Sequence, residues 1–201
     1  MSQVPPPGLI LASASRVRAQ LLQGARVPFT VQASQVDEDH IKQELAGQSA
    51  DVIAARLAEE KARAIAGDHG EDLIIGADQI LECEGRLFDK PKDRAGAETH
   101  LRDLRGRMHR LVTAAAVVRG PDLLWQTVAE TRLTMRDVSD EFIDAYLDSV
   151  GDDALASVGA YRLEDMGAQL FSKIDGDYFT ILGLPLLELL EFLRGQKVLE
   201  R

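Results

Sequence analysis

The sequence predicts an α/β fold built on a mixed β-sheet, and three features of the chain support this class. The core must be aliphatic, because hydrophobic residues make up 45% of the 201 residues and aromatic residues only 5%. Segments typical of strands alternate with segments typical of helices, as in layered α/β folds. Two long apolar segments, Leu111–Val118 and Leu124–Met135, flank Gly120-Pro121-Asp122 and predict a hairpin, so the sheet is not purely parallel.

The first predicted unit is a strand, a short turn and a helix. Leu9–Ala12 is a short apolar run typical of a buried strand. Ser15 is a suitable N-cap for a helix over Arg16–Leu22. Phe29–Ala33 is expected to form a second strand, and the acidic stretch Val36–Asp39 is expected to be a loop.

A long helix follows, capped by Ser49 or Asp51 and ending near Ala66. One face of this helix carries residues spaced four apart, which places them on a common stripe. Glu59 and Arg63 can form an ion pair on its outward part. The stripe consists of Ile53, Leu57, Lys61 and Ile65.

Leu73–Ala77 is the clearest strand, and Asp78 is expected at its end. Glu84-Gly85 predicts a turn between two further short strands. The remaining helices are predicted from their caps and periodicity. They begin after Asp93, after Ser139 and at Pro185, and end near Leu104, Tyr146 and Leu193 respectively.

Charge and cysteine content exclude several classes of function. The chain has 23 basic and 33 acidic residues, a formal net charge of −10, so we expect no nucleic-acid polymer as partner. Cys83 is the only cysteine, which excludes an intrachain disulfide and suits a reducing compartment. Leu9–Ala12 is too short for a signal peptide or membrane span. We therefore expect a cytoplasmic protein without a membrane partner.

Common catalytic motifs are absent from the sequence. There is no Gly-x-x-x-x-Gly-Lys-Ser/Thr loop, no Gly-x-Gly-x-x-Gly turn and no His-Glu-x-x-His pair. There is also no Gly-x-Ser-x-Gly elbow. The usual nucleotide-binding loops, zinc peptidases and serine hydrolases are thus disfavoured.

Cationic and hydroxyl side chains provide the candidates for binding an anion. Ser13 and Ser15 stand where a strand meets a helix, and Arg18 could add a forked guanidinium. Lys61 could reach into a cleft, and Lys90 lies in a proline-stiffened loop. The alternatives are an ordinary helix cap, a lysine extending along the edge of the core to solvent, and a solvated loop.

Two carboxylate sites could serve a metal ion or a water molecule. Asp78 follows a buried strand, where ligands of α/β folds collect, and a carboxylate there can activate water or bind a metal. Glu38 lies in the acidic stretch that could hold Mg²⁺ or Mn²⁺. The alternatives are a turn-forming aspartate and a solvated acidic loop. Together, these cations and carboxylates are the groups that phosphoanhydride hydrolysis requires.

Sequence motifs in the same order along nearly the whole chain resemble those of the Maf family. The opening motif is Leu9-Ile10-Leu11-Ala12-Ser13-Ala14-Ser15 with Arg18 and Leu21-Leu22. The later motifs are Val36-Asp37-Glu38, Leu57-Ala58-Glu59-Glu60-Lys61-Ala62, Ile75-Gly76-Ala77-Asp78-Gln79, Lys90-Pro91, Gly106–Thr113, Gly159–Gly167, Gly176-Asp177-Tyr178 and Gly183-Leu184-Pro185-Leu186.

The resemblance implies one Maf-like domain over residues 1–201, with residues 1–7 as a tail. It implies a twisted mixed sheet with helices on both sides, a central cleft between two lobes, and a homodimer. The implied activity is metal-dependent hydrolysis of a nucleoside triphosphate to the monophosphate and pyrophosphate. Asp78 would accept the proton. The phosphate and metal site would be lined by Ser13, Arg18, Glu38, Lys61 and Lys90.

Substrate choice is indicated by three positions. Gln79 and Glu164 match the branch of the family that acts on 7-methyl-GTP, whose cationic base would favour a carboxylate. Val17 stands where that branch has tryptophan and the pyrimidine branch has arginine, so a stacking side chain is missing. Gln79 and Glu164 favour a purine or modified base, whereas Val17 departs from both branches.

Two other classes of function remain open at the level of sequence. The chain could be a nucleotide-binding regulator of cell division that hydrolyses little, since the family is linked to division arrest and to removal of non-standard nucleotides. It could also be a scaffold that binds partners through its acidic surface. The retained Asp78, Glu38, Lys61 and Lys90 argue against a regulator that has lost the chemistry. A scaffold would not need cationic residues focused on one cleft.

Overall fold

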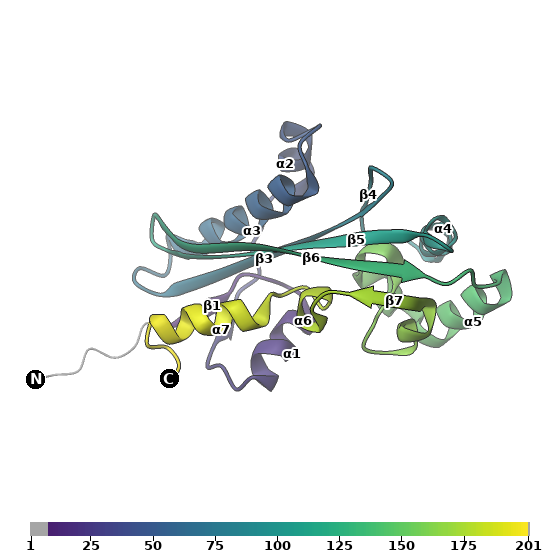
Figure 1. The fold of residues 1–201 in the computed structure, drawn as a ribbon. Coiled ribbons are helices and arrows are strands. Elements are labelled where there is room, and N and C mark those ends of the chain that lie inside the picture. The colour runs from purple at the N-terminus through teal and green to yellow at the C-terminus, as the bar shows by residue number, and fades with distance from the viewer. Residues whose placement is uncertain (1–7, 201) are drawn as a thin grey trace, which may run out of the picture. The chain divides into compact units, whose positions relative to one another are not determined.

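The computed structural model describes residues 8–200, so the predicted tail over residues 1–7 lies outside the described residues. The chain divides into two compact units. Unit 1 comprises the residues up to Asp78, Thr113–Ala129 and the residues from Gly183 onward, and unit 2 comprises Gln79–Val112 and Glu130–Leu182. A seven-stranded sheet in the order β2-β1-β3-β5-β6-β7, with β4 beside β3, supplies strands to both (Figure 1). The predicted mixed α/β class is confirmed.

Unit 1 is built on the parallel strands β1 (Leu9–Leu11), β2 (Thr30–Val31) and the first part of β3 (Leu73–Cys83). The register places Leu11 opposite both Val31 of β2 and Ile75 of β3. Parts of the hairpin strands β5 (Met108–Arg119) and β6 (Asp122–Met135) complete this half of the sheet. All three residues of β1 are buried, as the apolar run predicted.

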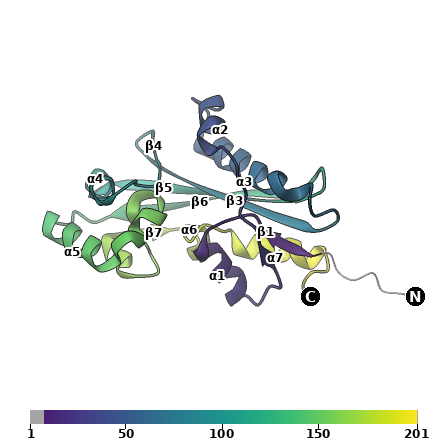
Figure 2. The ribbon, with the colours of Figure 1, turned by 180° about the vertical axis from the view of Figure 1, so that it is seen from behind.

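The helices of unit 1 cover both faces of its strands. Helix α3 (Ala50–Ala66) lies on one face, while α1 (Arg16–Gly24) and α7 (Leu186–Gly195) lie on the other, as the two opposite views show (Figures 1 and 2). A short helix, α2 (Glu38–Glu44), precedes α3. The predicted placement of helices on both sides of the sheet therefore holds within this unit.

Helix α3 lies unusually close to β3 because Gly76 has no side chain. A Cβ atom at Gly76 would stand 2.0 Å from the carbonyl oxygen of Ala58 and 2.7 Å from the nitrogen of Ala62. The predicted stripe of α3 is buried against the sheet, including Lys61. Because side chains of a strand alternate between faces, Asp78 points to the same side of β3 as Gly76. This packing brings Lys61 and Asp78 together.

Unit 2 contains the end of β3, the strand β4 (Arg86–Phe88) and the strand β7 (Phe171–Asp175), which pairs with β6. Its apolar core includes Leu104, Leu133 and Tyr146. Its helical elements are α4 (Arg94–Leu104), α5 (Asp140–Val150), α6 (Tyr178–Ile181) and the 3₁₀ turns Gly151–Ala156, Val158–Ala160 and Met166–Leu170.

Predictions that depended on local hydrogen bonds are confirmed. Ser15, Ser49, Asp93 and Ser139 each cap the helix that follows, since each side chain accepts a hydrogen bond from a backbone N–H in its first turn. The Glu84-Gly85 turn joins β3 to β4. Pro185 occupies the N-cap of α7, directly before the helix.

Several boundaries differ from the prediction. Asp78 does not end its strand, because β3 continues to Cys83 and pairs with β4 over its last residues. The acidic stretch Val36–Asp39 is not a loop throughout: the Asp37 side chain accepts from the N–H of His40 at 3.0 Å and starts α2, which includes Glu38. The strand expected over Phe29–Ala33 shortens to the two residues of β2. Strand β7 was not predicted, since its residues are largely exposed and lack an apolar run.

Candidate active site

Two carboxylates and one lysine meet in unit 1. The ammonium of Lys61 lies 2.6 Å from Asp78 Oδ1 and 2.8 Å from Glu38 Oε1. These residues come from α3, β3 and α2. The side chains of Lys61 and Asp78 are 11% and 8% exposed, and that of Glu38 is 44% exposed. The inner part of the cluster, at Lys61 and Asp78, is therefore buried, whereas solvent reaches its outer part at Glu38.

The position of Asp78 follows from the unequal lengths of neighbouring strands. Strand β1 ends at Leu11, opposite Ile75, and Ala12 N–H donates to the Ile75 carbonyl at 2.8 Å. Strand β3 continues past that point, so Asp78 projects beyond the carboxyl end of β1 although it lies within β3. Ligands collect at such ends in α/β folds, so the reason for selecting Asp78 stands although its predicted strand end was wrong.

The burial of Lys61 excludes a lysine that extends to solvent. Its residue exposure is 9%, and its ammonium donates to a buried carboxylate. A buried ion pair adds little net stability, because desolvation offsets most of the attraction. The pair does, however, hold opposite charges at fixed positions with little water around them, so their electrostatic interaction with a bound ion is strong.

Arg18 is held beside this cluster by backbone carbonyls. Its Nε donates to the Gly183 carbonyl at 2.7 Å, and one terminal nitrogen donates to the Ala77 carbonyl at 2.8 Å and to Ser13 Oγ at 3.2 Å. Burial lowers the pKa of Arg18, whereas the charges of Asp78 and Glu38 act to raise it. Arginine nevertheless remains charged in proteins, so a fixed cation lies near the two carboxylates.

Ser13 and Ser15 occupy the turn into α1 and serve partly structural roles. The buried Ser13 accepts a hydrogen bond from the N–H of Ser15 at 3.2 Å, and Ser15 Oγ accepts from the N–H of Arg18 at 3.4 Å. Ser15 therefore caps α1, and its role in binding phosphate remains a prediction. The N-terminus of α1 still carries the partial positive charge of a helix start, while Val17 lies half-buried in its first turn.

Three predicted residues belong to unit 2. Lys90 lines a hollow of about 400 Å³ together with Arg86 and Lys92. Gln79 donates its amide to the carbonyls of Thr180 and Ile181 at 3.0 and 3.1 Å. Glu164 accepts a hydrogen bond from Arg162 at 3.2 Å. Their roles in binding phosphate or base remain predictions.

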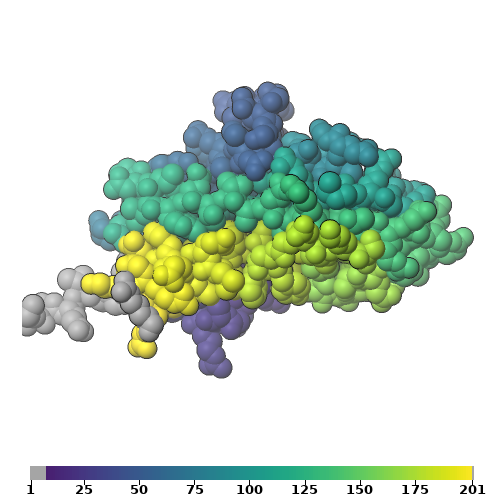
Figure 3. Space-filling view, in the orientation of Figure 1, coloured from purple at the N-terminus to yellow at the C-terminus, as the bar shows by residue number. Residues whose placement is uncertain are grey.

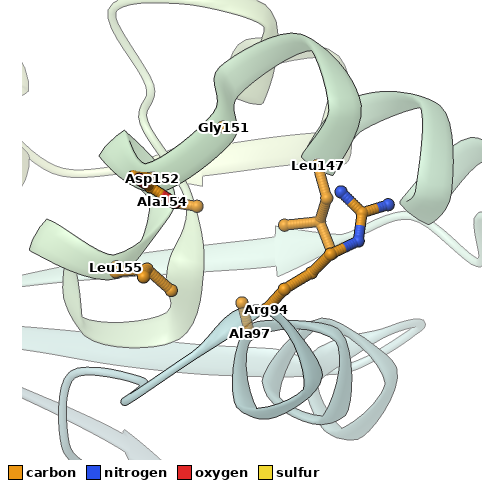
Figure 4. A pocket seen from close by; sticks show the side chains of 7 residues that line it. All are labelled: Arg94, Ala97, Leu147, Gly151, Asp152, Ala154 and Leu155. Atoms are coloured by element: carbon orange, nitrogen blue, oxygen red, sulfur yellow. The ribbon is translucent and has the colours of Figure 1, made fainter.

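A smaller cavity of about 70 Å³ lies between α4 and the start of the 3₁₀ turn that follows α5 (Figure 4). Its walls are mainly the aliphatic side chains of Ala97, Leu147, Ala154 and Leu155. Arg94 forms one side and binds Asp148 at 2.8 Å. The cavity contains none of the predicted site residues, and its size suits one or two water molecules rather than a nucleotide.

The carboxylates suit a hard divalent cation. In the part of the chain that the structure describes, no group of three or more His, Cys, Asp or Glu side chains could hold a metal ion. Mg²⁺, however, commonly binds through one or two carboxylates and completes its shell with water and substrate phosphates. Glu38 and Asp78 provide two, directed at one point by their shared contact with Lys61. The donor set therefore fits Mg²⁺ or Mn²⁺ brought together with a phosphate ligand.

Gly183 and Gly76 position the site but were not selected from the sequence as site residues. Gly183 has φ +98° and supplies the carbonyl that holds Arg18, and a Cβ atom there would lie 3.2 Å from Arg18 Nε. Gly76 allows the approach of α3. An isolated glycine inside a strand pattern signals a close backbone approach, so Gly76 could have been identified.

Fold and site together define a class: α/β proteins in which a partly buried acid–lysine–acid cluster lies beside an arginine and a helix N-terminus. The chain belongs to the Maf-like protein family, whose family model matches residues 8–196.

Curated relatives match nearly the whole chain. It is 51% identical over 191 residues to a nucleoside triphosphate pyrophosphatase of Nitrobacter winogradskyi, covering 95% of both chains. It is 46% identical over 187 residues to a protein of the same name from Paramagnetospirillum magneticum, covering 92% of this chain and 96% of the relative. A 7-methyl-GTP pyrophosphatase of Rhizobium meliloti is 47% identical over 190 residues, with 94% and 96% covered. No described helix is long and apolar enough to span a membrane.

Proposed function

We propose that this protein is a nucleoside triphosphate pyrophosphatase that hydrolyses the bond between the α and β phosphates. The observation that carries the proposal is the cluster of Asp78, Glu38 and Lys61, with two short contacts to one ammonium. Support comes from relatives of about half-identical sequence that bear this name. Membership of the Maf-like family agrees with it.

In the proposed reaction, Asp78 accepts a proton from a water molecule as the water oxygen attacks the α phosphorus. The bond from that phosphorus to the bridging oxygen breaks, and its electron pair leaves with pyrophosphate. The other product is the nucleoside monophosphate. A carboxylate in a poorly hydrated place suits this step, because its oxygen is not already surrounded by water, and Asp78 is 6% exposed.

Cations and hydroxyls bind the triphosphate in this proposal. Lys61 and Arg18 offset the negative charge of the phosphates, and the fixed hydrogen bonds of Arg18 keep its guanidinium in place. Ser13 and Ser15 line the start of α1, where a helix favours an anion. We also assign phosphate binding to Lys90, which lines its hollow with other basic residues.

We assign Glu38 and Asp78 as the residues that hold a divalent cation, Mg²⁺ or Mn²⁺. When bound, such an ion supplies positive charge that stabilises the charge developing on the phosphate oxygens. Lys61 already joins both carboxylates, so its contacts would be shared with the ion.

The same proposal covers the choice of base, the cellular role, the location and the oligomeric state. Val17, Gln79 and Glu164 are proposed to choose the base, with a purine or modified base favoured; a relative named 7-methyl-GTP pyrophosphatase supports this direction. A role in removing non-standard nucleotides, a link to division arrest, a cytoplasmic location and a homodimer are proposed with it.

Pyrophosphate release tests the proposal. The substrate panel should contain dTTP, UTP, GTP and 7-methyl-GTP, each with Mg²⁺ or Mn²⁺ and again with excess EDTA. Asp78→Asn is the test variant, and Asp68→Asn is its control, because Asp68 is an exposed aspartate of the same unit. We expect release by the wild type and by Asp68→Asn, and loss of release with Asp78→Asn or EDTA.

Three results would contradict parts of this scheme. Near-normal turnover by Asp78→Asn would remove the proton-accepting role. Activity that survives EDTA would remove the metal. Tight nucleotide binding without release from any substrate would instead favour a nucleotide-binding regulator of cell division.

A further inference from the structure

Arg162 binds two carboxylates that come from different segments of unit 2. Its Nε donates to Glu164 Oε1 at 3.2 Å, and one terminal nitrogen binds Asp153 of the 3₁₀ turn Gly151–Ala156. The side chains of Arg162 and Glu164 are 23% and 25% exposed. Atoms of this part of the chain, light green in Figure 3, reach the molecular surface. Glu164 therefore has a cation of its own chain beside it.

The backbone of Arg162 is fixed by two contacts. Its N–H donates to the hydroxyl of the fully buried Tyr146 at 3.1 Å, and that hydroxyl donates to the Ala160 carbonyl at 3.2 Å. A Cβ atom at Gly167 would stand 2.2 Å from the Arg162 carbonyl oxygen, so the chain packs directly against this residue. The guanidinium therefore extends from a fixed backbone position and is held by carboxylates at its far end.

Arg162 changes the charge that Glu164 presents to a ligand. Burial acts to lower the pKa of Arg162, but the hydrogen bond to Glu164 and the charges of Glu164, Asp153 and Asp165 outweigh this effect and raise the pKa. The guanidinium is therefore a permanent positive charge. It repels a positively charged base near Glu164 and so offsets the attraction of the carboxylate for that base. A neutral base does not meet this repulsion.

Glu164 keeps its capacity to accept hydrogen bonds from a ligand. Within residues 8–200, Arg162 is the only hydrogen-bond or ion-pair partner of its side chain, and the contact uses Oε1. An ionised carboxylate has about four acceptor positions on its two oxygens. Guanine carries an amino group beside a ring N–H, and these two donors can both point at one carboxylate. A carboxylate held by Arg162 therefore suits a neutral purine that carries N–H donors.

We propose that Arg162 is a specificity-determining residue that positions Glu164 and balances its charge. As a result, the base site takes a neutral purine with N–H donors in preference to a cationic, methylated purine. This inference rests on the proposed function, in which Glu164 contacts the base, and it narrows the substrate class given there. Arg162 acts through Glu164 and is a positioning residue, with no part in the attack of water on the α phosphorus.

An ion pair that only stabilises the fold is the alternative role for Arg162. By binding Asp153 as well as Glu164, Arg162 does join two segments of unit 2. Removing a purely structural contact would weaken the binding of every nucleotide by the same factor. Removing a charge that selects the base would instead change the ratio between a neutral and a cationic base, so this ratio distinguishes the two roles.

Binding of nucleoside monophosphates measures this ratio without turnover. Titration calorimetry compares GMP with 7-methyl-GMP, neither of which can release pyrophosphate, at a slightly acid pH that keeps the methylated base cationic. We expect the wild type to bind GMP more tightly. Arg162→Gln removes the charge but keeps an amide donor, so the ratio of the two dissociation constants should shift about tenfold in favour of 7-methyl-GMP.

Two further variants serve as controls. Arg162→Lys keeps the positive charge and should shift the ratio by less than about threefold. Arg107→Gln removes an exposed arginine of the same unit, which pairs with Glu84 at 3.1 Å, and should leave the ratio unchanged. Circular dichroism and thermal melts check that all three variants are folded.

Several outcomes would overturn the role of Arg162. They are tighter binding of 7-methyl-GMP than of GMP by the wild type, an unchanged ratio in Arg162→Gln, an equal shift in Arg162→Lys, and no binding of either monophosphate. Pyrophosphate release from GTP reports on the proposed function separately. Release without the shift removes only the role of Arg162, whereas the shift without release removes only the pyrophosphatase.

Discussion

Replacing Lys61 by methionine removes the ammonium that joins Asp78 and Glu38 but keeps a side chain of similar length. Asp78 then stays buried without its closest counter-charge, whereas Glu38 can turn toward solvent. Breaking a buried pair by removing one partner costs about 3–5 kcal/mol. The nearby Arg18 still attracts Asp78, so we expect a value near the low end, about 3 kcal/mol.

Changing Asp78 as well as Lys61 tests whether the stability losses of the two substitutions are coupled. Asp78→Asn alone should cost less, about 1–2 kcal/mol, because Lys61 keeps Glu38 as a partner. The double variant, Lys61→Met with Asp78→Asn, buries no unpaired charge. Its loss should therefore be smaller than the sum of the single losses, with a coupling of about 2 kcal/mol.

Denaturant unfolding at one pH, without nucleotide or metal, measures these free energies. Lys173→Met, on an exposed part of β7, is the matched control and should change stability by less than about 0.5 kcal/mol. Losses that add within about 0.5 kcal/mol would contradict the coupling, since the pair would then be screened by water as a surface pair is.

Two further predictions concern packing and pH. Gly76→Ala should lower stability by at least about 2 kcal/mol, because its Cβ would meet the Ala58 carbonyl at 2.0 Å. Gly67→Ala, at the open end of α3, is the control and should be close to neutral in thermal melts. Equal melting temperatures for the two variants would contradict the close approach of α3 to β3. Burial lowers the pKa of His109 to about 4 from 6.5, so the unfolded chain binds a proton at a higher pH than the folded chain does. The free energy of unfolding therefore decreases as the pH falls from 6.5 towards 4. Between pH 7 and pH 5, this histidine should account for about 2 kcal/mol of lost stability. His109→Gln should flatten the pH profile of unfolding, and an unchanged slope would refute the buried neutral state.

Local chemistry was sufficient to predict most helix starts. Ser49 and Ser139 accept hydrogen bonds from residues three positions along the chain, so each interaction depends on only four consecutive residues. The same holds for the ion pair of Glu59 and Arg63, which forms at 2.7 Å as predicted. The α/β class followed equally from local periodicity and from the hairpin at Gly120.

The residue types of the candidate site could be selected from the sequence, but not their arrangement. Lys61 lay on an apolar stripe, where extension to solvent was as consistent with the pattern as a cleft. Asp78 had a turn-forming alternative, and Glu38 could have been a solvated acid. These alternatives differ only in what lies across the helix or strand, which periodicity does not report.

By itself, the sequence determined the elements, their caps and the chemical types available for a site, because those depend on neighbours within a few residues. Tertiary structure alone decided that Lys61 joins Asp78 across 17 positions, and that Arg18 is held by a carbonyl 165 positions away. It also decided that β3 runs past Asp78. The physical reason is that burial and charge pairing depend on which surfaces meet, and distant segments meet only when the whole sheet has formed.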